Sequence, residues 1–402
     1  MESLRQLYRI GHGPSSSHTI GPENACLYVL RYYKNINKVK VTLQGSLALT
    51  GKGHLTDKVI EKTLASVSCE IVFDYKTIPN HPNTMIFDLY DKEEKLIKSI
   101  TFISVGGGKI IIDGKKNQIK SKNVYPFSSF KEIKEYCLSN NIDLAEFVYK
   151  FEDKNIKKYL NKVYVTMKKS ISNGLQKEGE LPGNLHVVRK AKQLFNSPKS
   201  KRNMAENELR IVSSYAFAVS EENASGGLIV TAPTCGASGV LPATLFYLKE
   251  KMHLKKEKII DALAVAGIIG NVIKENASIS GAFAGCQSEI GSACSMSAGA
   301  VSYLNKQDID VVEYAAEIAL EHHLGLTCDP INGLVQIPCI ERNAVASIRA
   351  IDAASLAKFL NKTRKVSFDT VIKTMYETGK DLNNNYKETS KGGLAKNYSP
   401  NL

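Results

Sequence analysis

The hydrophobic pattern changes along the 402 residues of the chain, and this change limits the folds that the chain can adopt. Up to about residue 112, short runs that alternate polar and apolar residues predict β-strands, with helices between them. From about residue 160 onward, apolar residues recur at helical spacing, as at positions 209, 212, 216 and 219. The sequence therefore predicts an α+β domain over residues 1–150 followed by an all-α domain over residues 160–395, each with its own core.

The expected elements follow from these patterns and from the glycines and prolines that interrupt them. In the first domain we expect helices at 23–34 and 57–66 and strands at 38–43, 70–75, 84–90, 97–105 and 109–112. The run Gly106-Gly107-Gly108 separates the last two strands and predicts a hairpin or a bulge. The helices expected in the later part are 129–138, 207–220, 241–251, 258–274, 310–324, 343–360 and 368–379.

The composition is that of a soluble globular protein, with 43% hydrophobic and 23% charged residues. The most apolar stretch, 259–273, is shorter than the roughly 20 residues that a membrane span needs. It also contains Asp261 and Asn271, so it predicts a buried helix and no membrane association. The N-terminal residues lack an apolar core of signal-peptide length, and we therefore expect a cytoplasmic protein.

The net charge of +13 would suit nucleic acid, an acidic membrane or an anionic substrate. The lysines, however, are spread over many segments, and no run interleaves arginine with aromatic residues. We interpret the charge as a lysine-rich solvated surface and expect no nucleic-acid partner.

The eight cysteines should be reduced in a cytoplasmic protein. Cys26, Cys69 and Cys137 lie in ordinary segments and are expected to be small buried hydrophobic residues. Cys235 and Cys294 lie instead in segments rich in glycine, serine and alanine, where the backbone can approach a ligand closely.

Cys286, Cys328 and Cys339 also lie in such segments. Cys328 follows Cys286 by 42 residues, and Cys339 follows Cys328 by 11, so these are not the closely spaced pairs of zinc fingers or ferredoxins. Spacing alone therefore leaves scattered core thiols as one interpretation. The other is an iron–sulfur cluster, which normally takes four ligands; with three thiolates, one iron stays open as a Lewis acid.

Two further polar segments precede these cysteines. In 11–22, three serines stand before His18, which favours a helix cap or a polar pocket. In 45–57, His54 lies among glycines and is a plausible general base near neutral pH. Arg342 follows the third cysteine and suits either a substrate carboxylate or a structural ion pair.

Taken together, these segments are similar to one family, the iron–sulfur-dependent L-serine dehydratases, or L-serine ammonia-lyases, of the single-chain type. The resemblance spans nearly the whole chain in order: Gly-Pro-Ser-Ser-Ser-His-Thr-Ile-Gly-Pro (13–22), Gly-Ser-Leu-Ala-Leu-Thr-Gly-Lys-Gly-His-Leu-Thr-Asp (45–57), 104–108, 231–243, 285–294, 327–343 and Tyr-Lys-Glu-Thr-Ser-Lys-Gly-Gly-Leu-Ala (386–395).

The resemblance implies a cofactor as well as a fold. Cys286, Cys328 and Cys339 would bind a [4Fe-4S] cluster in the helical catalytic domain, with Cys294 as a neighbour and Cys235 unassigned. Some members carry a terminal cysteine that occupies the open iron. Because this sequence ends Ser-Pro-Asn-Leu, we do not expect such self-inhibition here.

The same resemblance implies the reaction, which converts L-serine to pyruvate and ammonia. The catalytic base would be His54, with Lys52 and Thr56 beside it. The residues expected to line the cleft or bind the substrate are Ser16, Ser17, His18 and Arg342. The family also implies a homodimer and a smaller domain that resembles a regulatory serine-binding domain.

Two other interpretations stay open at this point. A pyridoxal phosphate enzyme could run the same reaction, but no lysine motif with a downstream phosphate-binding glycine loop is found. A structural-metal or redox-sensing thiol protein would use the same cysteines without catalysis. The long cysteine spacings and the two histidine segments argue against it.

Overall fold

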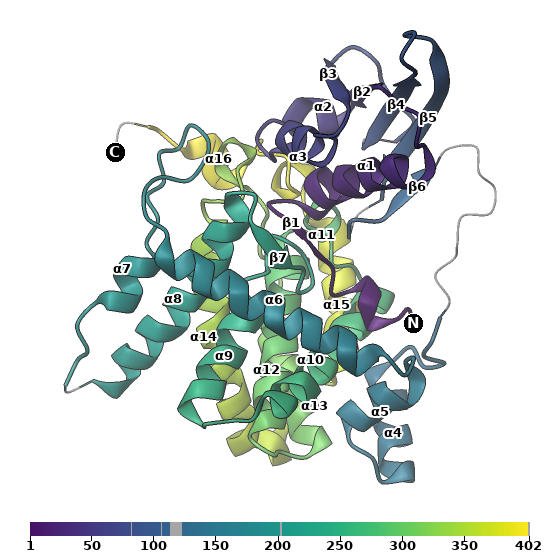
Figure 1. Ribbon diagram of the computed structural model, residues 1–402. Helices are drawn as coiled ribbons and strands as arrows, with labels where there is room; N and C mark the ends of the chain where they lie inside the picture. The colour runs from purple at the N-terminus through teal and green to yellow at the C-terminus, as the bar shows by residue number, and fades with distance from the viewer. Residues whose placement is uncertain (82, 106, 113–122, 202, 401–402) are drawn as a thin grey trace. The chain divides into compact units, whose positions relative to one another are not determined.

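The computed structural model describes residues 1–81, 83–105, 107–112, 123–201 and 203–400 (Figure 1). They form two compact units, one of Gly11–Lys120 and one of Met1–Ile10 together with Ser121–Leu402. The predicted fold class is confirmed, since a mixed α/β region is followed by a largely helical one. The domain ranges 1–150 and 160–395 stay a prediction. Gly106, part of the expected connection and the last two residues lie outside the described residues.

The Gly11–Lys120 unit contains a five-stranded sheet in the order β3-β2-β4-β5-β6. Its strands are β2 (Lys38–Gln44), β3 (Ser68–Asp74), β4 (Thr84–Tyr90), β5 (Leu96–Ser104) and β6 (Ile110–Ile112). β2 runs parallel to β3, and the other neighbours are antiparallel. Every second residue of β2 is fully buried, which is the pattern that predicted the strand.

Two helices supply the other half of this core. Ala25, Cys26 and Val29 of α1 (Gly21–Tyr32) pack in one cluster with the buried side chains of the sheet and with Val59 and Ile60 of α3 (Thr56–Thr63). Cys26 is thus the small buried hydrophobic residue that the sequence predicted.

The five expected strands and both expected helices of this region are confirmed, and β5 and β6 form the predicted antiparallel hairpin. Two short helical segments were not predicted. They are η2 (Ser16–Ile20), which lies in the polar segment 11–22, and α2 (Ser46–Thr50), which lies in the polar segment 45–57.

The other unit is helical. Its longer elements are α4 (Phe130–Asn140), α5 (Leu144–Phe151), α6 (Ile156–Gln176), α7 (Ala191–Asn196), α8 (Met204–Ala224), α9 (Val240–Lys251), α10 (Lys256–Asn276), α12 (Ser292–Leu304), α13 (Ile309–Glu321), α14 (Cys339–Leu360) and α15 (Phe368–Asp381). Short elements are η1 (Leu4–Gln6), β7 (Leu228–Val230), α11 (Gly281–Ala284), η3 (Gln287–Gly291), η4 (Ile331–Gly333), η6 (Asn384–Tyr386) and α16 (Gly393–Asn397).

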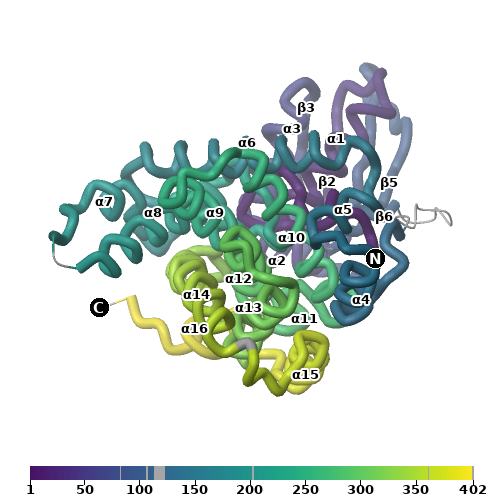
Figure 2. The backbone as a smooth tube through the Cα atoms, turned by 90° about the horizontal axis from the view of Figure 1, so that it is seen from below, coloured from purple at the N-terminus to yellow at the C-terminus, as the bar shows by residue number. Residues whose placement is uncertain are grey.

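The centre of this unit is α12, which contacts α9, α10, α13 and α14 (Figure 2). Nearly all of its residues are buried, and most are serine, alanine or glycine. Small residues let the neighbouring helices approach: a Cβ on Gly299 would lie 2.2 Å from Cδ1 of Ile269 on α10. The apolar stretch 259–273 forms the buried part of α10. Among the described helices, none has the length and apolar character needed to cross a membrane.

The first ten residues belong to the helical unit. Leu4, Leu7 and Tyr8 are fully buried, and the Tyr8 hydroxyl donates to the carbonyl of Leu263 at 2.8 Å. The α-amino group of Met1 donates to the carbonyl of Tyr125 at 2.8 Å.

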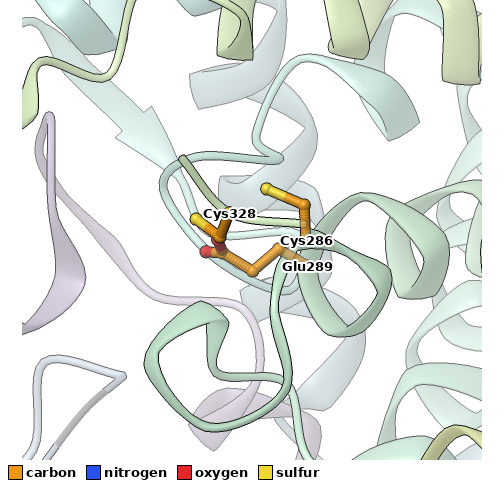
Figure 3. A group of neighbouring side chains, drawn as sticks. All are labelled: Cys286, Glu289 and Cys328. Atoms are coloured by element: carbon orange, nitrogen blue, oxygen red, sulfur yellow. The ribbon is translucent and has the colours of Figure 1, made fainter. Parts of the chain in front are cut away.

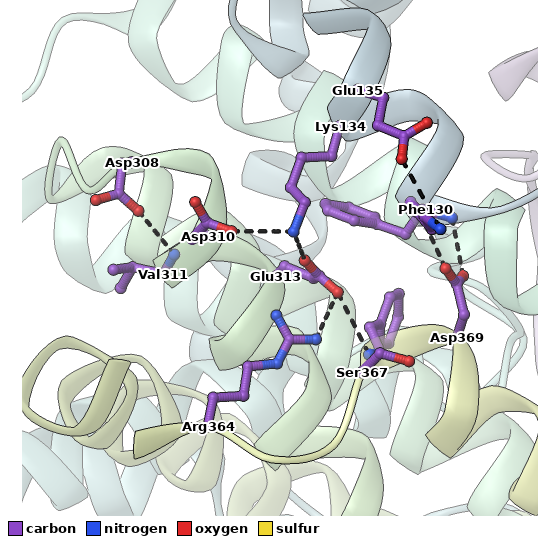
Figure 4. A network of polar contacts seen from close by, with 12 residues as sticks. Phe130, Lys134, Glu135, Asp308, Asp310, Val311, Glu313, Arg364, Ser367 and Asp369 are labelled. Carbon is purple, nitrogen blue, oxygen red and sulfur yellow. Dashed lines mark hydrogen bonds and ion pairs between the residues drawn. The ribbon is translucent and has the colours of Figure 1, made fainter. Parts of the chain in front are cut away.

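Ion pairs and hydrogen bonds of buried and half-buried side chains connect α4, α13 and α15 at the periphery of this unit (Figure 4). Glu313 on α13 accepts from Lys134 of α4 at 2.8 Å and also pairs with Arg364, which precedes α15. Asp369 of α15 accepts from the backbone N–H of Phe130 at 2.8 Å, at the start of α4. α15 is thereby fixed beside α11 and η3, the elements that flank Cys286.

Candidate active site

The three candidate ligand cysteines all lie in the helical unit. Cys286 immediately precedes η3, Cys328 lies in the loop that follows α13, and Cys339 is the first residue of α14. All three are buried, and all are free thiols. The helix ends and Pro-containing loops therefore bring together residues that are far apart in the sequence.

Two of these thiols form a compact group with a carboxylate that the sequence did not single out. One ligand atom each from Cys286, Glu289 and Cys328 lies within 4.8 Å of the other two (Figure 3). The Sγ of Cys328 is 4.0 Å from Oε2 of Glu289. Glu289 lies three residues after Cys286, so a helical segment places both on one face.

The electrostatics of this group favour a cation. Contact with Cys286 and burial raise the pKa of the Cys328 thiol, and burial together with Cys286 raises the pKa of the Cys339 thiol. Bringing three sulfurs and a carboxylate together disfavours the thiolate forms unless positive charge is supplied. Thiolates are the preferred ligands of iron–sulfur groups, so these donors fit such a cofactor.

Arg342 is a cationic neighbour of the thiols. Its guanidinium interacts with Cys286 and Cys339, and these interactions help to raise its pKa. It also donates to the carbonyl of Thr327 at 2.7 Å and to the carboxylate of Asp329 at 3.3 Å. The arginine therefore takes part in a structural ion pair, while its contact with the thiols places it at the candidate site.

The space around the group is kept open by a glycine. A Cβ on Gly281 would lie 2.4 Å from Oε2 of Glu289 and 3.3 Å from Sγ of Cys328. Any side chain here would press on the donor atoms themselves, which explains a glycine at the start of α11.

Cys294 lies apart from the group. It is fully buried on α12, its Sγ approaches the carbonyl of Ala346 at 3.2 Å, and burial raises its pKa. Cys235 is also buried, in the turn that precedes α9. These positions are compatible with the prediction that Cys294 is not a ligand.

The histidine candidates lie in the other compact unit. The rings of His18 and His54 are 4.7 Å apart between centroids, and both are buried. The His18 ring contacts the hydroxyls of Ser17 at 2.9 Å and Ser46 at 3.0 Å, so both of its nitrogens are engaged. The Nδ1 of His54 contacts the carbonyl of Thr50 at 3.0 Å.

This pair is held by a network of hydroxyls. Thr56 donates to the carbonyl of His18 at 2.5 Å, and Thr19 donates to the carbonyl of His54 at 2.8 Å. Ser104, from β5, donates to the carbonyl of Ser17 at 2.7 Å. The network fixes the backbone of both histidine segments against the sheet.

Burial keeps both rings neutral. It lowers the pKa of His18 to about 3, with a further contribution from His54, and it also lowers the pKa of His54. The other two candidates of this region differ: Ser16 is half-buried at the start of η2, and Lys52 is exposed, with its ammonium 5.2 Å from the centroid of the Phe73 ring.

Comparison with known proteins identifies the chain at the level of a family. The model of the serine dehydratase alpha chain matches residues 80–395, and that of the beta chain matches residues 3–72. The chain belongs to the serine dehydratase family. It combines both chain types in one polypeptide, as expected for the single-chain type.

Full-length relatives agree with this result. The chain is 40% identical to L-serine dehydratase of Helicobacter pylori, with 98% of each sequence covered. It is 39% identical to L-serine dehydratase 1 of Escherichia coli, covering 98% of this chain and 99% of the relative. The corresponding protein of Streptomyces coelicolor is 38% identical, again over 98% of each. The predicted family is confirmed, and with it an enzyme rather than a structural or sensing protein.

Proposed function

We propose that this chain dehydrates L-serine to pyruvate and ammonia, using a [4Fe-4S] cluster held by Cys286, Cys328 and Cys339. The observation that carries the proposal is the buried group of thiols and a carboxylate in a chain of this family. L-Serine comes from the names of the full-length relatives.

The reaction requires two difficult steps, loss of a weakly acidic α-proton and departure of hydroxide. When bound, an iron–sulfur group with an open iron would supply the Lewis acid for the departing hydroxide. The elimination product, aminoacrylate, tautomerises to an imine and hydrolyses to pyruvate and ammonia.

His54 is the proposed base, and the hydrogen bonds of the histidine pair support it over His18. With its Nδ1–H directed to the Thr50 carbonyl, neutral His54 carries its lone pair on Nε2. His18 has both ring nitrogens bonded to serine hydroxyls. His54 therefore has the basic nitrogen available to take the α-proton, and its lowered pKa keeps that nitrogen unprotonated.

The remaining candidates have supporting roles in this proposal. Thr56 holds the backbone of His18, and Ser17 orients the His18 ring. Ser16 and Lys52 are accessible enough to contact a small polar substrate. Arg342 balances the negative charge of the thiolates and of the substrate carboxylate. The homodimer, the regulatory serine site and the cytoplasmic location stay predictions.

Anaerobic purification tests the proposal directly. Iron and inorganic sulfide are measured, and pyruvate formation from L-serine is assayed before and after exposure to air. We expect activity that falls together with the iron content. Activity that survives complete loss of iron would contradict the cluster. Bleaching by borohydride would indicate pyridoxal phosphate, and bound zinc without serine deamination would indicate a structural metal.

A further inference from the structure

A C-terminal segment that carries the family resemblance still lacks a role. Residues 386–394, here called the C-terminal brace, run along the Cys328 loop. The backbone N–H of Cys328 donates to the carbonyl of Tyr386 at 2.8 Å, and the N–H of Glu388 donates to the carbonyl of Cys328 at 2.8 Å. The brace therefore pairs with the backbone of a candidate ligand on both sides of its Cα.

Further hydrogen bonds extend this pairing along the loop. The hydroxyl of Ser390 donates to the carbonyl of Pro330, and the N–H of Leu394 donates to the Asp329 carboxylate, both at 2.7 Å. Asp329 is the residue that also pairs with Arg342. The brace, the cysteine loop and the arginine thus form one connected structure.

The brace has a specified conformation. Glu388 and Ser390 have φ angles of 59° and 54°, a region that side-chain-bearing residues seldom adopt. Gly393 has a φ of 55°, and a Cβ there would lie 1.9 Å from the Asp329 carboxylate. Only glycine is compatible with that contact, so the brace has one register on the loop.

The result is a fixed position for the Glu388 side chain. Its carboxylate accepts a hydrogen bond from the backbone N–H of Ala282 in α11, on the Cys286 side of the group, and the nearby Glu289 carboxylate disfavours its ionised form. Its own backbone is bonded to Cys328. Glu388 is exposed as a residue, but burial of its carboxyl group and the neighbouring Glu289 raise the pKa of that group to about 8. Glu289 is partly buried and interacts with Thr234 and Arg342.

We propose that Glu388 binds the α-ammonium group of the amino-acid substrate. This inference rests on the proposed function, which supplies a substrate with an ammonium group. One hydrogen bond from Ala282 leaves acceptor capacity on the carboxylate, and an ammonium group offers three donors. Glu388 is exposed as a residue and its backbone is bonded to Cys328, so a small molecule bound beside that cysteine can reach it. Its role is to position the substrate and to select an amino acid over a hydroxy acid.

The test compares L-serine with L-glycerate, in which a hydroxyl stands in place of the ammonium group. Ammonia release measures serine turnover, and L-glycerate is added as a competitor. E388Q should raise the KM for L-serine roughly tenfold to a hundredfold, the effect expected from loss of a charged hydrogen-bond partner. The inhibition constant of L-glycerate should change less than threefold, and kcat should change less than KM.

Structural damage is separated by a second set of measurements. Gln retains an acceptor for the Ala282 N–H, so E388Q should keep the iron and sulfide content and visible absorption of the wild type. E388D, which keeps the charge, should recover part of the discrimination between the two ligands. E377Q, at an exposed glutamate of α15, serves as the matched control and should behave as wild type.

Two results would overturn the inference. One is an unchanged KM for L-serine in E388Q, and the other is an equal weakening of L-serine and L-glycerate. A wild-type protein that releases no ammonia from L-serine would instead refute the proposed function, so the two failures are distinguishable.

Discussion

The thiol group of the helical unit and the histidine pair of the sheet-containing unit are built on opposite principles. Around His18 and His54, hydroxyls and carbonyls satisfy one another, and burial keeps both rings uncharged. Around Cys286 and Cys328, burial gathers groups that repel one another once they ionise. The histidine pair is complete as folded, whereas the thiol group becomes favourable only when a cation joins it.

The largest expected effect comes from replacing the candidate ligand cysteines of the thiol group. C286S, C328S and C339S should each lose bound iron and sulfide and reduce pyruvate formation to background, because serine is a poor ligand for iron–sulfur groups. Iron analysis and the visible spectrum of anaerobic protein are the measurements. C294S is the matched control and should retain the cluster, since Cys294 lies on α12 away from the group. Cluster loss in C294S would show that the ligands are misassigned.

The next effect concerns the histidine side alone. H54A should lower kcat by about 10²–10⁴, the usual contribution of a positioned base, while the iron content stays at the wild-type level. Steady-state kinetics and iron analysis on the same samples separate the two groups of residues. Near-normal turnover with an intact cluster would mean that another group takes the α-proton.

The pH dependence of kcat/KM is a second test of His54 as the base. A base acts in its unprotonated form, and the lowered pKa of His54 keeps it unprotonated to a lower pH than a free histidine. The acid limb that His54 contributes to kcat/KM should therefore lie below pH 6.5, the ordinary histidine value. Rate profiles between pH 4.5 and 8, with samples returned to pH 7.5 to check recovery, give the answer. Because the pKa of Glu388 is raised to about 8, the profile is also measured in E388Q, and a reversible limb at or above pH 6.5 that persists in this variant would exclude His54.

The smallest effect tests whether the histidine pair is preassembled by its hydroxyls. T56V removes the donor to the His18 carbonyl without changing the side-chain shape, and Thr56 is fully buried. Leaving that carbonyl unsatisfied should cost about 1–3 kcal/mol, measured by urea unfolding. T63V is the control, because Thr63 is only half-buried and the Val59 carbonyl that accepts from it lies within a helix. Equal losses in both variants would argue against a special role for Thr56.

The sequence predicted the elements with strong local signals. β2 and β4 alternate buried and half-buried residues, and Ser129 with Glu132 marks the start of α4 by a capping box, so their positions depend on neighbours in the chain. By contrast, α12 is buried on all sides and made of small residues, so it has no polar face to produce a helical period.

The candidate site was predictable in part. The cysteines and histidines were visible as residue types, and the family resemblance supplied their grouping. Glu289 could have been found only after η3 was known to be helical, because only then do positions 286 and 289 share a face. The contact between His18 and His54 depends on hydrogen bonds such as that from Thr56 to His18, which no spacing rule predicts.

The pairing of Cys328 with Tyr386 and Glu388 means that the Cys328 loop can be fixed only late in the synthesis of the chain. A ribosome-bound chain that has emerged only as far as Asp381 already contains all three candidate cysteines. It lacks the residues that fix the loop around the second one. The backbone contacts that hold Cys328 therefore form only after the residues up to Glu388 have been synthesised.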